Sequence, residues 1–132
     1  MTPEALIIES MLRVPTKTGE DVDFCLNNEQ RQLDQNLTGR DLIPKARQMG
    51  VTTYFLARYL IVCLSRRNMR AVIVSHERES TERLLFRVRY FIDNIRGPKP
   101  VTEHLSKSEI TFPKTNSMFY IGTAGSRKFG RG

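Results

Sequence analysis

The chain has 132 residues, of which 39% are hydrophobic, and it carries a formal net charge of +7. This size suits a single domain with its own apolar core. The two cysteines exclude a disulfide framework, and neither they nor the two histidines have the spacing of a metal site built from protein ligands. Apolar runs are too short for a membrane span, and acidic residues near the start do not suit a signal peptide. We therefore expect no membrane segment and a reducing, intracellular setting.

Charge is unevenly distributed along the sequence. Residues 1–41 hold four basic and eight acidic side chains, a net charge of −4, whereas residues 66–100 hold nine basic and four acidic, a net charge of +5. The last nine residues add three cations and no acid. A basic second half indicates a polyanionic partner such as nucleic acid or nucleotide, although any single arginine also suits a solvated helix face.

In chain order, the first expected element is a short helix over residues 1–12, with Thr2 as its cap. Residues 13–26 favour a hairpin, because polarity alternates after a turn-like stretch. A helix from about 29 to 37 should follow, capped by Asn27 or the asparagine after it. These elements make up an N-terminal segment.

The second half alternates strands and helices. The expected elements are a short buried strand at 42–43, a helix at about 52–66, a strand at 71–74, a helix at about 80–95, and two strands at 109–112 and 117–121 that suit a hairpin. The continuous apolar run of the second strand is typical of a parallel strand covered on both faces. The alternation predicts an α/β fold with a mainly parallel sheet flanked by helices.

The connection over residues 45–53, Lys-Ala-Arg-Gln-Met-Gly-Val-Thr-Thr, lies between an expected strand and helix, where a phosphate-binding loop belongs. In register with the usual G-x-x-x-x-G-K-[ST] pattern, Lys45 stands for the first glycine, Val51 replaces the lysine, and Gly50 and Thr52 are kept. A phosphate cradle needs a glycine for close backbone approach, a cation, and a hydroxyl for Mg²⁺. Gly50, Lys45 and Thr52 supply these groups. The pattern alone fits an ordinary strand-to-helix connection with a threonine cap equally well.

Ligands of open α/β sheets bind at the carboxyl ends of the strands. In the expected layout that edge collects the 45–52 loop, residues 75–76 after the next strand, and residues 123–132 after the last one. The phosphate loop and both basic segments would thus lie on one rim. This placement favours a nucleotide site.

With these residues placed, the chain resembles the N-terminal ATPase domain of phage terminase large subunits, the DNA-packaging motors, over about residues 13–132. The resemblance is carried by four segments: Phe-Cys-Leu-Asn-Asn-Glu-Gln at 24–30, the 45–53 loop, Val-Ile-Val-Ser-His at 72–76, and residues 117–132. It implies a P-loop NTPase-like α/β fold and a single, partial ATPase domain over 1–132. Residues 1–40 would form the helix, the hairpin and the adenine-side segment, and 41–132 the P-loop sheet core.

The resemblance also implies roles for individual residues. The family includes loops of the Lys-x-Arg-Gln-x-Gly-x-[ST] kind, which implies Lys45 as the catalytic phosphate lysine and Thr52 as the Mg²⁺ ligand. A glutamine upstream of the loop contacts the adenine in the family; by position this is Gln30, with Gln32 as a neighbouring competitor. The rest of the implied ATP-binding stretch comprises Arg47, Gln48, Met49, Gly50, Val51 and Thr53.

Near the end of the sequence, the family places an arginine that reaches the γ-phosphate of a neighbouring subunit. Arg131 matches this arginine, with Arg127 as the runner-up, and contact with the DNA backbone or simple solvation is an equal alternative for Arg131. The acidic (Walker B) strand, which holds Mg²⁺ and activates water in the family, and the family's nuclease domain would both follow residue 132. We therefore expect the front part of a larger protein, which binds ATP and Mg²⁺ without efficient hydrolysis of its own.

The leading interpretation is the ATP-binding part of a terminase large subunit, which powers the movement of viral DNA into a procapsid in the host cytoplasm. The implied partners are double-stranded DNA, further copies in a homo-oligomeric ring, the terminase small subunit and the portal protein. A second hypothesis is a non-enzymatic nucleic-acid-binding or assembly module with a degenerate P-loop. A helicase-like fragment fits less well, because helicase loops normally keep the lysine that Val51 replaces.

Overall fold

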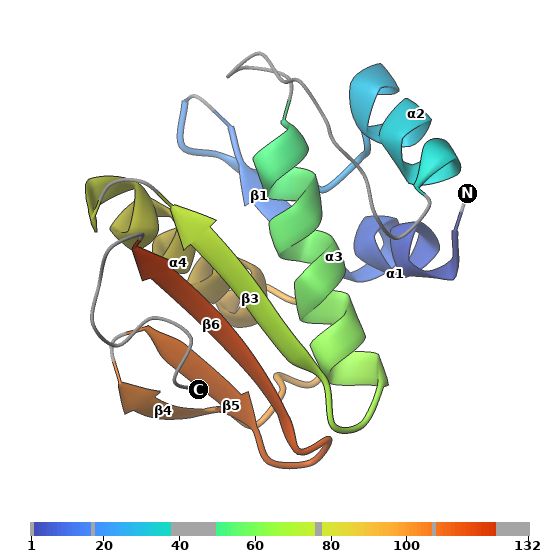
Figure 1. The fold of residues 1–132 in the computed structure, drawn as a ribbon. Coiled ribbons are helices and arrows are strands. Elements are labelled where there is room, and N and C mark those ends of the chain that lie inside the picture. Colours follow the sequence, from blue (N-terminus) through green and yellow to red (C-terminus); the bar gives the residue numbers. More distant parts are fainter. Residues whose placement is uncertain (1, 17, 38–49, 76–77, 107, 124–132) are drawn as a thin grey trace.

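The computed structural model describes residues 2–16, 18–37, 50–75, 78–106 and 108–123. Its elements follow in the order α1 (Pro3–Met11), β1 (Arg13–Pro15), β2 (Asp21–Asp23), α2 (Asn28–Asn36), α3 (Val51–Ser65), β3 (Arg70–Ser75), α4 (Arg78–Asp93), β4 (Glu103–Ser106), β5 (Glu109–Phe112) and β6 (Ser117–Thr123) (Figure 1). This is a mixed α/β arrangement, as expected from the alternation in the sequence. The expected strand at 42–43 lies outside the described residues.

The larger sheet has four strands in the order β3-β6-β5-β4. β3 and β6 are parallel, whereas β6 pairs with β5 and β5 with β4 in antiparallel fashion. The expectation of a mainly parallel sheet is therefore wrong for the described strands. Two residues separate β4 from β5 and four separate β5 from β6, lengths that suit antiparallel neighbours, whereas the chain passes from β3 through α4, β4 and β5 before it reaches the parallel strand β6. The expected hairpin of the last two strands is confirmed.

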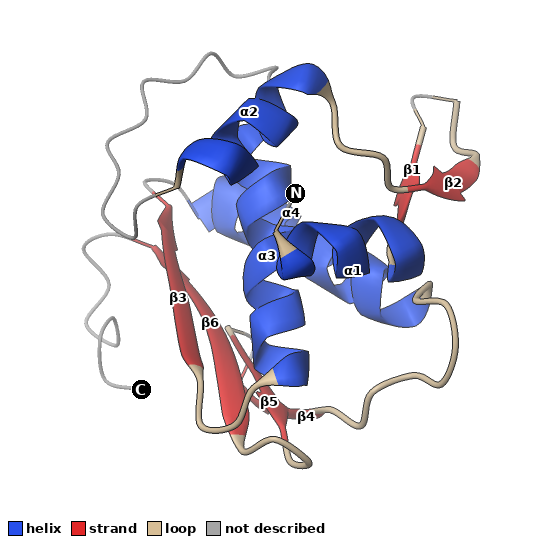
Figure 2. Ribbon diagram, turned by 90° about the vertical axis from the view of Figure 1, so that its right-hand side faces the viewer, coloured by secondary structure: helices blue, strands red, loops and turns tan. Residues whose placement is uncertain are grey.

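α3 and α4 lie on the same face of this sheet (Figure 2). Phe119 and Ile121 of β6 are buried in the core, and Ala71 and Ile73 of β3, their register partners, pack against the same core. The side chains of Val72 and Val74 point to the other face and remain 47% and 50% exposed. The apolar run of β3, expected to be covered on both faces, is thus covered by the described helices on one face only.

The N-terminal elements pack against the helices of the molecule. Thr2 caps α1, its hydroxyl accepting a hydrogen bond from the Ala5 amide, and Ile8 of α1 is buried with α3 residues in the core. The β1–β2 hairpin, as expected, pairs antiparallel and is tied to α4 by the hydrogen bond from the Tyr90 hydroxyl to Asp21. None of the helices in the described part of the chain is long and apolar enough to cross a membrane.

Candidate functional site

α2 begins with a reciprocal cap. The Asn27 side chain accepts a hydrogen bond from the Gln30 amide at 2.8 Å, and the Gln30 Oε1 atom accepts one from the Asn27 amide at 2.9 Å. This capping box satisfies two amides that the helix leaves without partners. It also fixes the Gln30 side chain, which is only 4% exposed.

Gln30 then reaches Gly50, the N-cap residue just before α3. Its Nε2 atom donates to the Gly50 carbonyl at 2.8 Å, and the same carbonyl accepts the Tyr54 amide at 3.0 Å in the first turn of the helix. Gly50 has φ 72° and ψ 14°, the left-handed region that glycine adopts without strain. A Cβ atom on Gly50 would lie 2.7 Å from Gln30 Nε2. The backbone conformation and the approach of Gln30 therefore both favour glycine here.

The start of α3 has two features that favour an anion. The first amides of a helix lack partners within it, and Gly50 has no side chain with which to cap them. Val51, Thr52 and Thr53 form the first turn, which contains no acidic residue. Together with the helix dipole, this arrangement favours a negatively charged group.

A cation reaches this turn from α4. The Arg87 Nη1 atom donates to the Thr53 hydroxyl at 2.6 Å, so Thr53 acts here as the acceptor that holds Arg87. The sequence interpretation did not select Arg87. It is one of nine basic residues between 66 and 100, and only the packing of α4 beside α3 decides which of them reaches the helix start.

The carboxyl ends of β3 and β6 form the other part of the expected rim. Ser75 and Thr123 are partners in the register, and the Thr123 hydroxyl lies 2.8 Å from the hydroxyl of buried Thr81 on α4. Figure 1 shows these strand ends and the N-terminal end of α3 at the same end of the molecule. The described pieces of the rim therefore lie at one end, as the topology predicted.

Several predicted site residues lie outside the described residues: Lys45, Arg47, Gln48 and Met49 of the loop, and Arg127 and Arg131 near the end of the sequence. Their roles stay predictions. Among the described residues, no group of three or more His, Cys, Asp or Glu side chains suits a metal ion.

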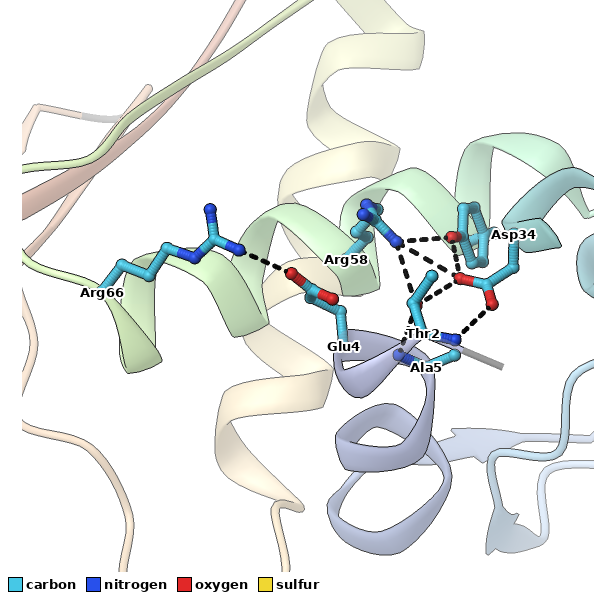
Figure 3. Close-up of polar contacts among 7 residues, drawn as sticks. Thr2, Glu4, Ala5, Asp34, Arg58 and Arg66 are labelled. Atoms are coloured by element: carbon cyan, nitrogen blue, oxygen red, sulfur yellow. Dashed lines mark hydrogen bonds and ion pairs between the residues drawn. The ribbon is translucent and has the colours of Figure 1, made fainter. Parts of the chain in front are cut away.

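A buried carboxylate fixes α2 relative to α3 (Figure 3). Asp34, whose side chain is fully buried, accepts hydrogen bonds from the Thr2 amide at 2.9 Å, the Thr2 hydroxyl at 2.6 Å and the Tyr54 hydroxyl at 2.6 Å. Arg58 Nη1 lies 3.3 Å from it. Burial raises the pKa of Asp34, but the hydrogen bonds from Thr2 and Tyr54 and the charge of Arg58 outweigh it, so the pKa is lowered overall. Burial and the bond to Asp34 raise the pKa of Tyr54, which stays a neutral donor.

This network was not foreseen from the sequence. Asp34 lies in a helix rich in polar residues, where nothing local distinguishes a buried carboxylate from a solvated one. Tyr54 lies one turn after Gly50, so the network holds the start of α3 against α2 where Gln30 meets Gly50. It positions the candidate site without facing it.

Comparisons with known proteins identify no relative of this chain. No protein-family model matches the chain, and no similar sequence was found among curated proteins. The described residues themselves supply the candidate site: a helix start without a capping side chain, a left-handed glycine fixed by Gln30, and a cation from α4.

Proposed function

We propose that the chain is the ATP-binding part of a terminase large subunit, the motor that drives viral DNA into a procapsid. The contact between Gln30 and Gly50 supports this most directly. The resemblance assigns one residue to the adenine side and the other to the phosphate loop of a single site. They are 20 positions apart in the sequence, yet Gln30 Nε2 and the Gly50 carbonyl oxygen are 2.8 Å apart.

In this proposal the amides at the start of α3 and the Lys45 ammonium hold the phosphates, and the Thr52 hydroxyl is a ligand for Mg²⁺. Bound Mg²⁺ would neutralise charge on the phosphate oxygens. In this proposal Gln30 contacts the adenine. The bonds with Gly50 and Asn27 use one of the two donors and one of the two acceptor lone pairs of its amide, and its side chain is 4% exposed in this structure. Arg131, or Arg127, would serve the site of a neighbouring subunit in a ring.

The same proposal assigns double-stranded DNA as the substrate that is moved, and the terminase small subunit and the portal protein as partners in the host cytoplasm. Efficient hydrolysis requires the acidic strand that the family carries after the part matched here. The first property to measure is therefore nucleotide binding, which depends on the residues of this chain.

We expect Lys45→Ala to abolish the binding of a fluorescent ATP analogue measured with Mg²⁺, because the mobile cation on the phosphates is lost. Lys114→Ala is the matched control. Lys114 is exposed in the β5–β6 turn, whose Thr115 bonds to the Cys63 carbonyl near the far end of α3. This control should bind like the unaltered chain. Equal affinity of the two variants would contradict the proposal and favour the non-enzymatic nucleic-acid-binding or assembly module.

A further inference from the structure

α4 carries an exposed phenylalanine between two arginines. Phe86 is 68% exposed, more than any other large hydrophobic side chain in the described part of the chain. Arg83, one turn earlier, and Arg87, the next residue, are also exposed. The buried side of α4 is formed by other residues: Leu85, Val88, Phe91 and Ile92. Phe86 therefore does not pack in the core, and core packing does not explain a phenylalanine at this position.

The surface around Phe86 is shallowly hollowed. The hollow has a volume of about 640 Å³, and its described lining residues are Glu82, Arg83, Phe86 and Arg87. The bond from Arg87 to the Thr53 hydroxyl holds the guanidinium of the residue next to Phe86 at the start of α3. Two cations and one carboxylate leave this lining with a net positive charge.

The charge of the surrounding surface matches that of the hollow. Between residues 81 and 99 the exposed charged side chains are Arg83, Arg87, Arg89, Arg96 and Lys99, against Glu82 and Asp93, and Arg96 is paired with Asp23 of β2. With Asp23 included, five cations face three anions, and this excess of positive charge favours a polyanion. The Phe86 ring among these charges restricts the kind of nucleic acid, because an aromatic ring stacks on a base only where the face of the base is accessible. Duplex DNA keeps its base faces stacked, whereas a single strand exposes them.

We propose that this face of α4 binds single-stranded nucleic acid, with Phe86 stacking on a base and Arg83 and Arg87 contacting the phosphates on either side. Flat aromatic side chains in a positively charged groove are how proteins bind single strands with little sequence preference. The proposal goes beyond ATP binding. It shares Arg87 with the candidate site at the start of α3, whereas Phe86 and Arg83, on which its test depends, do not belong to that site.

The test is fluorescence anisotropy of the chain with a labelled oligothymidine of about 12 nucleotides, in a series of salt concentrations and without ATP. We expect Phe86→Ala to weaken single-strand binding about tenfold while leaving its salt dependence unchanged. Arg83→Gln should instead lower the slope of log affinity against log salt by about 0.7. Phe86→Tyr, which keeps the ring, should bind like the unaltered chain.

Two control variants remove similar groups elsewhere. Leu6→Ala removes an apolar side chain that is 58% exposed on α1, and Arg67→Gln removes an exposed arginine just after α3. Both should leave single-strand affinity unchanged. The proposal is overturned if the unaltered chain does not bind the oligothymidine, if Phe86→Ala binds as tightly as Phe86→Tyr, or if Phe86→Ala weakens binding of a duplex of the same length to the same extent.

Discussion

Gly50 joins two helices through one carbonyl, which accepts hydrogen bonds from Gln30 Nε2 and from the Tyr54 amide. Its φ of 72° disfavours any residue with a Cβ atom, and such an atom would also lie 2.7 Å from Gln30 Nε2. We therefore expect Gly50→Ala to lower the free energy of unfolding by more than about 1 kcal/mol. Urea unfolding followed by circular dichroism measures this change.

Gly97→Ala separates the two causes. Gly97 has φ 90°, but a Cβ atom there meets nothing within 4 Å. Its replacement should cost only the backbone strain, whereas Gly50→Ala should cost that strain and the displacement of Gln30. If both variants lose the same stability, the Gln30 side chain moves aside freely, and the close approach seen in the structure does not constrain this residue.

For single residues, local motifs could be predicted from the sequence, whereas packing partners could not. Gly50 and Thr52 belong to a pattern with fixed spacing, and the structure places both at the start of a helix, as predicted. Arg87 and Asp34 belong to no such pattern. Arg87 acquires its partner because α4 packs beside α3, and Asp34 is buried because α1 and α3 meet at α2.

Gln30 both caps α2 and attaches it to α3. It does so through two different side-chain atoms, so the two hydrogen bonds can be removed separately. Gln30→Glu keeps the oxygen that accepts the Asn27 amide, as in the usual capping box, but places a carboxylate against the Gly50 carbonyl. We expect it to destabilise the protein by about 2 kcal/mol at neutral pH, because a buried donor is replaced by a charged acceptor. Gln30→Ala, which places no second acceptor against the Gly50 carbonyl, should cost about 1 kcal/mol.

Gln32→Glu provides the matched control, because it makes the same change on an exposed side chain of the same helix. It should change the free energy of unfolding by less than about 0.5 kcal/mol. The extra loss in Gln30→Glu should also shrink at low pH, where the introduced carboxyl is protonated and able to donate to the Gly50 carbonyl. Equal effects of the two Glu variants would show that α2 is not tied to α3 through Gln30.

The helices and strands were predicted better than the way in which they pack and pair. The helices were predicted within about two residues of their observed limits, because caps such as Thr2 and Asn27 and the apolar periodicity are local signals. Strand direction is not local. β4 was missed, and the turns around β5 made most of the described sheet antiparallel. The apolar run of β3 indicated a buried strand, but the run alone does not show how many faces helices cover.

For the molecule as a whole, the Asp34 network joins α1, α2 and α3, and it makes stability depend on pH. In the unfolded chain the carboxyl has its ordinary pKa near 3.8, and in the folded chain its pKa is lower. Between these two values the unfolded chain binds more protons, so the free energy of unfolding rises with pH. The contribution of Asp34 is therefore present above about pH 4 and is lost as the pH falls through the folded pKa.

Asp34→Asn should remove this contribution. At pH 7 we expect a loss of about 3 kcal/mol, because the variant leaves the charge of Arg58 and the donors of Thr2 and Tyr54 without their carboxylate. Urea unfolding should be measured from about pH 2.5 to about pH 7, a range that includes the ordinary aspartate pKa. Over this range the stability of Asp34→Asn should decline less in acid than that of the unaltered chain. Asp93→Asn, which neutralises an exposed carboxylate on α4, should stay within about 0.5 kcal/mol at pH 7. If Asp34→Asn keeps the full acid decline, other carboxylates govern the acid stability of the fold, and Asp34 does not hold the three helices together through its charge.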